Sequence, residues 1–213
     1  MNSRRARAIF ARFAAANPEP QSELRYRSPF QLLVAVILSA QATDKGVNAA
    51  TGKLFAVANT PRAIAQLGVD GLKPYVRTIG LYNGKAAHIV AMAQILLAEH
   101  GGRVPRTRAA LEALPGVGRK TANVVLNTAF GEPVIAVDTH VFRVAKRIGL
   151  ATGDTPRAVE DELQRRTPSE YRRHAHHWLI LHGRYVCKAR RPACWCCLIR
   201  DLCEYPDKTP APP

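Results

Sequence analysis

No cysteine precedes Cys187 in this chain of 213 residues. A disulfide framework would spread its cysteines along a small secreted chain, so this distribution argues against one. Long apolar runs are also missing, since the most apolar segment, 30–40, is interrupted by Gln31 and Ser39. The start of the chain lacks the apolar core of a secretory signal. We therefore expect an intracellular, cytoplasmic protein that does not enter a membrane.

Acidic residues are scarce relative to basic ones. Sixteen Asp and Glu stand against thirty-one Lys and Arg, which gives a formal net charge of +15 and a pI near 10.2. Such a field attracts polyanions, and nucleic acid is the leading candidate. A solubility bias or an anionic membrane surface would also suit this balance. We interpret the acid-free, Arg-rich segment 1–13 as an amphipathic helix that touches phosphates rather than as a transit peptide.

Period-two strand patterns are nearly absent. Only 134–137 hints at a strand, and it is too short to build a sheet. Helix signals dominate instead, including a Ser or Thr cap followed by Pro at 28–29, 60–61 and 155–156. Further helices are expected to begin near Asp44, Asn83, Thr107, Arg119, Asp138 and Ser169. The predicted fold class is all-α.

Two glycines, Gly116 and Gly118, form a short turn between two of these predicted helices. Glycine permits positive φ and close backbone approach. The turn amides and the start of the next helix would then bind a DNA phosphate without reading base sequence. The plain alternative is an αα-corner with glycine as a C-cap. The neighbouring Arg119, Lys120 and Thr121 favour the phosphate site because they add positive charge.

Lys120 is predicted to lie in the first turn of a helix, where the dipole disfavours a cation. The apolar residues Val117 and Val124 are expected to add desolvation. Both effects disfavour the charged amine, which is how a lysine becomes a nucleophile near neutral pH. The alternative is a solvated lysine that only binds phosphate.

Asp138 follows one predicted helix later. As an N-cap its carboxylate would accept backbone N–H bonds and stay ionised. An ionised carboxylate stabilises a developing sugar cation, as glycosidase carboxylates do. The alternative is a cap without a chemical role. His140 is open to two interpretations, a hydrogen-bond donor to a neighbour or a core histidine.

All five cysteines fall within seventeen residues. Cys187, Cys194, Cys197 and Cys203 are separated by six, two and five residues. Four thiolates so close in sequence predict one metal or cluster site, and the spacing alone leaves zinc and a cubane iron–sulfur cluster open. Cys196 departs from this pattern, and we assign it as a free or packed thiol.

Several of these segments together resemble one known family. The segments 114–130 and 135–140 are similar to the endonuclease III family of helix–hairpin–helix DNA glycosylases with a Gly/Pro-Asp loop. The likeness extends to 38–44, 79–83 and 177–183, and therefore covers nearly the whole chain.

The resemblance implies a base-excision-repair glycosylase with abasic-site lyase activity toward oxidised pyrimidines in double-stranded DNA. Lys120 would attack C1′, displace the base and form a Schiff base, and β-elimination would cut the strand 3′ to the lesion. Asp138 would be the essential carboxylate, acting on Lys120 or on the sugar cation. Gln41 and Leu81 would fill the space left by the flipped base. Without the family, these two residues would be interpreted as an ordinary helix-end Gln and loop Leu.

The resemblance also implies a cofactor and an organisation. The cysteines Cys187, Cys194, Cys197 and Cys203 would hold a structural [4Fe–4S] cluster. The lobes would be 22–132, which contains the hairpin, and 1–21 plus 133–213, which contains the cluster, with the site in the cleft between them. The chain would act as a monomer near the nucleoid. Further DNA contacts are expected from Gly116, Val117, Gly118, Arg119, Thr121, His140, Lys188, Arg190 and Arg191.

Two other functions stay open at this point. One is an adenine or mismatch glycosylase of the same fold, whose members usually carry a longer C-terminal domain and lack this lysine, so that a chain ending at Pro213 argues against it. The other is a DNA-binding scaffold without catalysis.

Overall fold

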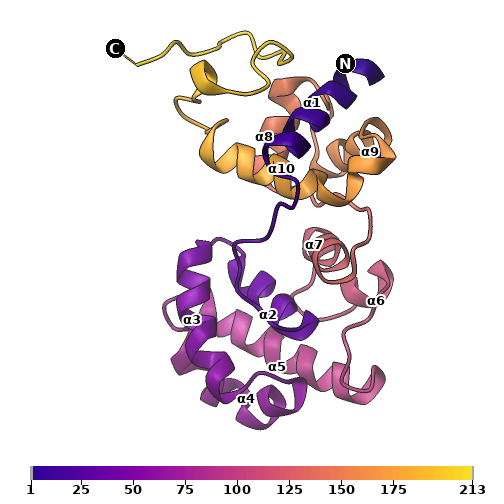
Figure 1. Cartoon of the computed structure of the whole chain (residues 1–213). Helices are drawn as coiled ribbons and strands as arrows, with labels where there is room; N and C mark the ends of the chain where they lie inside the picture. The colour runs from indigo at the N-terminus through magenta and orange to yellow at the C-terminus, as the bar shows by residue number, and fades with distance from the viewer. Residues whose placement is uncertain (1, 213) are drawn as a thin grey trace. The chain divides into compact units, whose positions relative to one another are not determined.

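The structure is a computed structural model that describes residues 2–212 (Figure 1). It confirms the all-α prediction, because no strand occurs among these residues and 134–137 is irregular chain. In chain order the elements are α1 (Ser3–Ala16), α2 (Pro29–Ser39), α3 (Asp44–Val57), α4 (Pro61–Val76), α5 (Tyr82–Glu99), α6 (Arg108–Glu112), α7 (Arg119–Phe130), α8 (Thr139–Ile148), α9 (Pro156–Arg166), the 3-10 turn η1 (Ser169–Tyr171), α10 (Arg172–Tyr185) and the 3-10 turn η2 (Cys194–Cys196). No helix of the described part is long and apolar enough to cross a membrane.

Side-chain caps set most of the helix starts. Ser28, Thr60 and Thr155 each accept a hydrogen bond from the backbone N–H three residues on, and each precedes a proline. Thr107 and Asp138 cap α6 and α8 in the same way. These starts confirm the sequence predictions, because each cap satisfies an amide that has no partner inside its helix.

Three other predicted starts differ in detail. Helix α3 begins at Asp44 as expected, and its cap is Thr43. The helix expected after Asn83 begins at Tyr82, and Ser169 opens the 3-10 turn η1 that precedes α10. The residue before α5 is Leu81, in the left-handed conformation with a φ of 59°. A leucine rarely adopts this conformation, so the local sequence does not predict it.

The chain divides into two compact units. The first combines the chain up to Gln21 with the chain from Glu132 onward, and the second runs from Ser22 to Gly131. Lys120 therefore belongs to the second unit, and Asp138 belongs to the first.

Helix α2 forms the centre of the second unit. Every residue from Phe30 to Leu38 is buried, and α2 packs against α3, α5 and α7. A helix that is apolar all round is one that other helices surround. This explains why 30–40 is the most apolar run of the sequence.

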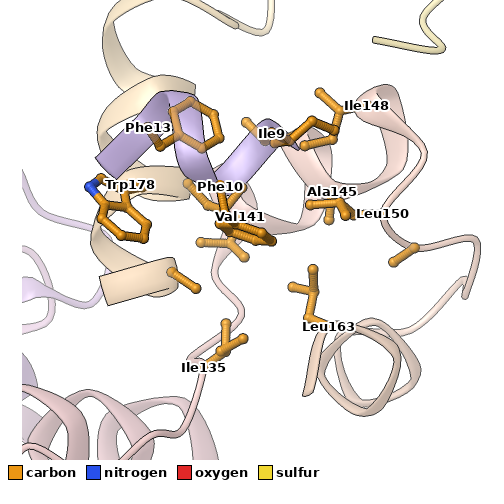
Figure 2. Close-up of a cluster of buried hydrophobic side chains, with 14 of the residues drawn as sticks. Ile9, Phe10, Phe13, Ile135, Val141, Ala145, Ile148, Leu150, Leu163 and Trp178 are labelled. Atoms are coloured by element: carbon orange, nitrogen blue, oxygen red, sulfur yellow. The ribbon is translucent and has the colours of Figure 1, made fainter. Parts of the chain in front are cut away.

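The core of the first unit lies among α1, α8, α9 and α10. Phe10 is fully buried there, with Val141, Leu163 and Trp178 around it (Figure 2). The indole Nε1 of Trp178 donates a 2.8 Å hydrogen bond to the carbonyl of Asn17, so the ring is buried without an unpaired donor. The core thus ties α1 to helices that come more than a hundred residues later.

Basic residues of α1 hold the loop 198–204. Arg5 Nε donates to the carbonyl of Leu202 at 2.6 Å, and Arg12 donates to Asp201 Oδ2 at 2.8 Å. The hydrogen bond from Arg12 lowers the pKa of the Asp201 carboxyl to about 2. Arg5 and Arg12 thus bind protein groups, and phosphate contact by this helix stays a prediction.

Candidate active site

The predicted hairpin is formed by α6, the turn 113–118 and α7. Leu114 and Val117 are buried beneath the turn, and the amide of Val117 donates a 3.1 Å hydrogen bond to the carbonyl of Leu114. Gly116 has a φ of 76°, and a Cβ at this position would lie 3.0 Å from Cβ of His88 on α5. The turn thus requires glycine at 116 for its backbone conformation and for its packing.

Gly118 differs from Gly116 in both respects. It is the N-cap of α7 with an ordinary φ of −93°, and an added Cβ would meet no heavy atom of the described residues within 4 Å. Glycine has no side chain to cap the first amides of α7. A helix start of this kind offers its amides and the positive end of its dipole to an anion.

The side chains beside the turn project from the start of α7. Lys120 is exposed, whereas Val117 and Val124 are buried in the core. The two valines therefore pack into the core, while the side chain of Lys120 is exposed. Arg119 Nη1 lies 3.9 Å from Glu112 Oε1, and Thr121 is half-buried.

A buried contact holds the two hairpin helices together. Arg108 Nε on α6 donates a 2.9 Å hydrogen bond to Oδ1 of Asn123 on α7. Asn123 is fully buried, so this bond is shielded from water. Neither residue was predicted, although Asn123 in an apolar helix face is a signal of such a role.

Asp138 begins α8 in the first unit. Its Oδ1 accepts a 2.8 Å hydrogen bond from the amide of Val141, and the side chain is half-buried. The preceding residues 135–137 are buried, and His176 Nδ1 lies 2.9 Å from the carbonyl of Ala136. The carboxylate is therefore placed by a fixed segment as well as by the helix start.

The close packing of α8 on α10 places His140. A Cβ on Gly183 of α10 would lie 2.9 Å from Cβ of His140. The ring of His140 is half-buried, and its Nδ1 lies 3.3 Å from Arg143 Nη2. Burial lowers the pKa of Arg143, although Asp138 and a Cys187 thiolate oppose this effect. The structure thus gives His140 a polar neighbour on its own helix.

Four of the five cysteines interact electrostatically. Burial raises the pKa of the Cys197 thiol to about 11, and the negative charges of Cys203, Cys187 and Cys194 act in the same direction. Cys196 is exposed. The charge of each thiolate disfavours ionisation of the neighbouring thiols. A bound metal cation has the reverse effect, because its positive charge stabilises the thiolates.

Within residues 2–212 no three His, Cys, Asp or Glu side chains gather closely enough to bind a single metal ion. A cubane cluster places each cysteine on a different iron atom, so its ligands do not have to meet at one ion. The four interacting thiols fit such a cluster.

Two arginines of α8 hold the start of the cysteine loop. Arg143 donates to the carbonyls of Gly183 and Cys187 at 2.8 and 3.1 Å. Arg147 donates to the carbonyls of Lys188 and Ala189 at 2.6 and 3.1 Å. The helix that Asp138 caps is therefore tied to the loop that carries the first cysteine.

The predicted basic loop lies on the surface. Lys188, Arg190 and Arg191 are all exposed, and Arg191 has a φ of 48°. The cysteine loop is also supported by His182, whose Nε2 lies 3.7 Å from Cys197 Sγ. Arg143 and Arg147 bind the backbone of this loop, and the side chains of its three basic residues are exposed.

The two residues predicted to fill a flipped-base gap belong to the same unit. Gln41 has a φ of 56°, and Leu81 has a φ of 59° with 70% of its surface exposed. A Cβ on Gly80 would lie 4.0 Å from the carbonyl oxygen of Gln41, so the two loops are adjacent. Left-handed backbone at both residues is strained, and such strain concentrates at functional sites.

Known proteins are similar to this chain in sequence and fold. The HhH-GPD superfamily of base excision DNA repair proteins matches residues 34–169. An endonuclease III of Haemophilus influenzae is 60% identical over 98% of this chain and 99% of its own, and one of Escherichia coli K12 is 59% identical with the same coverage. A solved endonuclease III, trapped as a covalent intermediate with DNA, matches with a TM-score of 0.89 at 44% identity, covering 95% of this chain and 96% of its own.

The helical class and the hairpin agree with these matches. The chain therefore belongs to the HhH-GPD superfamily and, within it, to the endonuclease III family of DNA glycosylases with abasic-site lyase activity.

The two hairpin glycines differ in the loss of stability that an alanine is expected to cause. We expect Gly116→Ala to lower the free energy of unfolding by about 1–3 kcal/mol, because the left-handed backbone and the contact with His88 both resist a Cβ. Gly118→Ala should cost less than about 1 kcal/mol, since only cap preference changes. Urea unfolding followed by circular dichroism measures both, and equal losses would contradict this division.

Proposed function

We propose that this chain excises oxidised pyrimidines from double-stranded DNA and cleaves the resulting abasic site, with Lys120 as the nucleophile. The observation that carries the proposal is an exposed amine in the first turn of α7, next to a glycine turn that gives the helix no side-chain cap. Phosphate binding at the start of α7 would bring the DNA backbone to the amine. The similar endonuclease III that was trapped covalently with DNA supports a covalent route.

The chemistry needs one amine, one displacement of the base and one elimination. The neutral amine of Lys120 attacks C1′, and the bond from C1′ to the base breaks with its electron pair leaving on the base. Ring opening gives a Schiff base between Lys120 and C1′. Loss of a proton from C2′ then expels the 3′ phosphate oxygen, and water releases Lys120. The strand is cut 3′ to the lesion.

Asp138 supplies the negative charge for this reaction. Its capping hydrogen bond uses Oδ1 and holds the carboxylate at a fixed helix start. A fixed carboxylate either stabilises the positively charged sugar or acts on the amine of Lys120. Both roles depend on the charge and not on the cap alone.

The target nucleotide must leave the base stack before attack. We propose that Gln41 and Leu81 enter the duplex at this stage, the amide to meet the orphaned base and the leucine to act as a wedge. The 70% exposure of Leu81 suits a side chain that becomes buried only in DNA.

The proposed nucleophile, carboxylate and wedges all come from a single chain, so we propose a monomer acting on cellular DNA at the nucleoid.

The four interacting thiols would hold a [4Fe–4S] cluster through Cys187, Cys194, Cys197 and Cys203. Such a cluster supplies folding energy to a loop with little core of its own. The loop would present Lys188, Arg190 and Arg191 to phosphates, and His140 would lie near the same DNA. The proposed hairpin contacts are Gly116, Val117, Gly118, Arg119 and Thr121.

Borohydride trapping tests the nucleophile. With a duplex that contains thymine glycol or an abasic site, the wild-type chain should form a covalent adduct after reduction. Lys120→Ala should lower the rate of trapping by about a thousandfold or more, because no other amine replaces the nucleophile. Lys53→Ala, which removes an exposed lysine from the same unit, is the control. Trapping by Lys120→Ala at the wild-type rate would refute the mechanism.

A change at Asp138 separates its charge from its cap. Asparagine caps a helix as well as aspartate does, so Asp138→Asn should keep the stability of the first unit. We expect its single-turnover excision rate to fall by about a hundredfold or more, because the negative charge is lost. If Asp138→Asn excises at the wild-type rate, Asp138 acts only as a helix cap.

Two neighbouring cysteines test the cluster. The purified chain should show a broad absorption band near about 400 nm, which four-thiolate iron–sulfur ligation gives and zinc does not. Cys197→Ser should lose most of this band, whereas Cys196→Ser should keep it because that thiol is exposed and outside the proposed set. A colourless chain with bound zinc, or equal losses in both variants, would contradict the assignment.

A further inference from the structure

Lys85 is a buried lysine with no part in the proposed chemistry. It lies on α5 in the second unit, 6% exposed, beside the fully buried Ala86 and Ile89. Its Nζ donates hydrogen bonds to the carbonyls of Leu38 and Ala40, at 2.9 and 2.5 Å. Burial lowers the pKa of this amine. A lysine is rarely placed in a core unless its ammonium meets specific partners.

The two acceptors lie at the carboxyl end of α2. The last carbonyls of a helix have no partner within it, and the helix dipole makes this end negative. The C-cap of α2 is Ala40 and not a glycine, so the common glycine closure is replaced by an ammonium from another helix. Lys85 therefore fixes the point at which the chain leaves α2.

The residue that follows this point is Gln41, with a φ of 56°. The backbone amide of Lys85 also donates a 3.1 Å hydrogen bond to the carbonyl of Leu81, whose φ is 59°. Gly80 approaches the carbonyl of Gln41 from the same loop. One residue thus binds the backbone on both sides of this pair, with its side chain before Gln41 and its amide at Leu81.

We propose that Lys85 is a positioning residue that holds Gln41 and Leu81 in one fixed arrangement, ready to enter the duplex together. This inference rests on the proposed function, in which these two side chains replace the flipped nucleotide. Lys85 touches neither base nor sugar in this proposal. It acts by holding two strained backbone positions that would otherwise relax.

The physical reason is preorganisation. Left-handed backbone at a non-glycine residue persists only where its surroundings impose it. If the two loops were loose, DNA would have to order them during binding, which weakens binding. An ammonium buried between two carbonyls orders them during folding instead. The step that depends on this order is base extrusion, not the chemistry at C1′.

Lys85→Met tests the proposal, because methionine keeps the length of the stem and removes the ammonium. Lys53→Met, an exposed lysine on α3, is the matched control for the lost charge. Three readouts separate the steps: single-turnover excision from duplex, fluorescence of 2-aminopurine opposite the lesion, and cleavage of an abasic site in a single strand. A single-stranded abasic site needs no base extrusion.

We expect Lys85→Met to slow duplex excision and the 2-aminopurine signal by about tenfold or more, since small misplacements at a site have effects of this size. Cleavage of the single-stranded abasic site should fall far less. Lys85→Met should also add little when combined with Gln41→Ala/Leu81→Ala, because it acts only through those residues. Lys85→Arg, which keeps a cation, should restore part of the signal.

Other results overturn the inference. Equal losses on both substrates would make Lys85 a structural residue only. Wild-type duplex excision by Lys85→Met, or full additivity with Gln41→Ala/Leu81→Ala, would show that Lys85 does not act through the two loops. If the double variant Gln41→Ala/Leu81→Ala excises at the wild-type rate, the proposed wedge role is wrong, and the inference about Lys85 is wrong with it. This test of the wedge role uses no variant of Lys85, so the two failures can be told apart.

Discussion

The backbone groups at helix ends are the constraint on which the rest of the structure depends. A helix leaves amides at its start and carbonyls at its finish without partners, and each must be satisfied. Ser28, Thr60 and Thr155 do this locally for their helices. At α7 the cap position is Gly118, which offers no side chain, so this helix start has no side-chain cap. The proposed phosphate site thus lies at a helix start that has no side-chain cap.

Many of the basic residues serve the protein itself. Arg143 and Arg147 bind carbonyls of the cysteine loop, Arg5 and Arg12 hold 198–204, and Lys85 closes α2. The formal charge of +15 therefore overstates how many cations face a nucleic acid. The charge still sets the sign of the field that draws a polyanion, because cations keep their charge when they bind neutral carbonyls. Arginine and lysine thus serve both the attraction of nucleic acid and the hydrogen bonds within the fold.

The sequence predicts those features of this protein that are encoded by a few adjacent residues. The caps at Ser28 and Asp138, the hairpin glycines and the cysteine spacing each occupy a few adjacent residues, and the helix starts follow from them. Lys85 and Arg143 were missed because each binds carbonyls that lie more than forty residues away. The burial of Val117 and Val124 and the exposure of Lys120 depend on packing across the fold, which the local sequence does not contain. The contacts of a side chain across a fold are not contained in its neighbours along the chain.

The discontinuity of the first unit has a consequence for synthesis. The second unit is one continuous stretch, so all of its helices are available once Gly131 has left the ribosome. Helix α1 is made first, yet its apolar face packs on α8 to α10, and its arginines bind residues 198–204. Its partners emerge last. Each new chain therefore carries an exposed apolar helix through most of its translation, and the ordering of that helix marks the completion of the molecule.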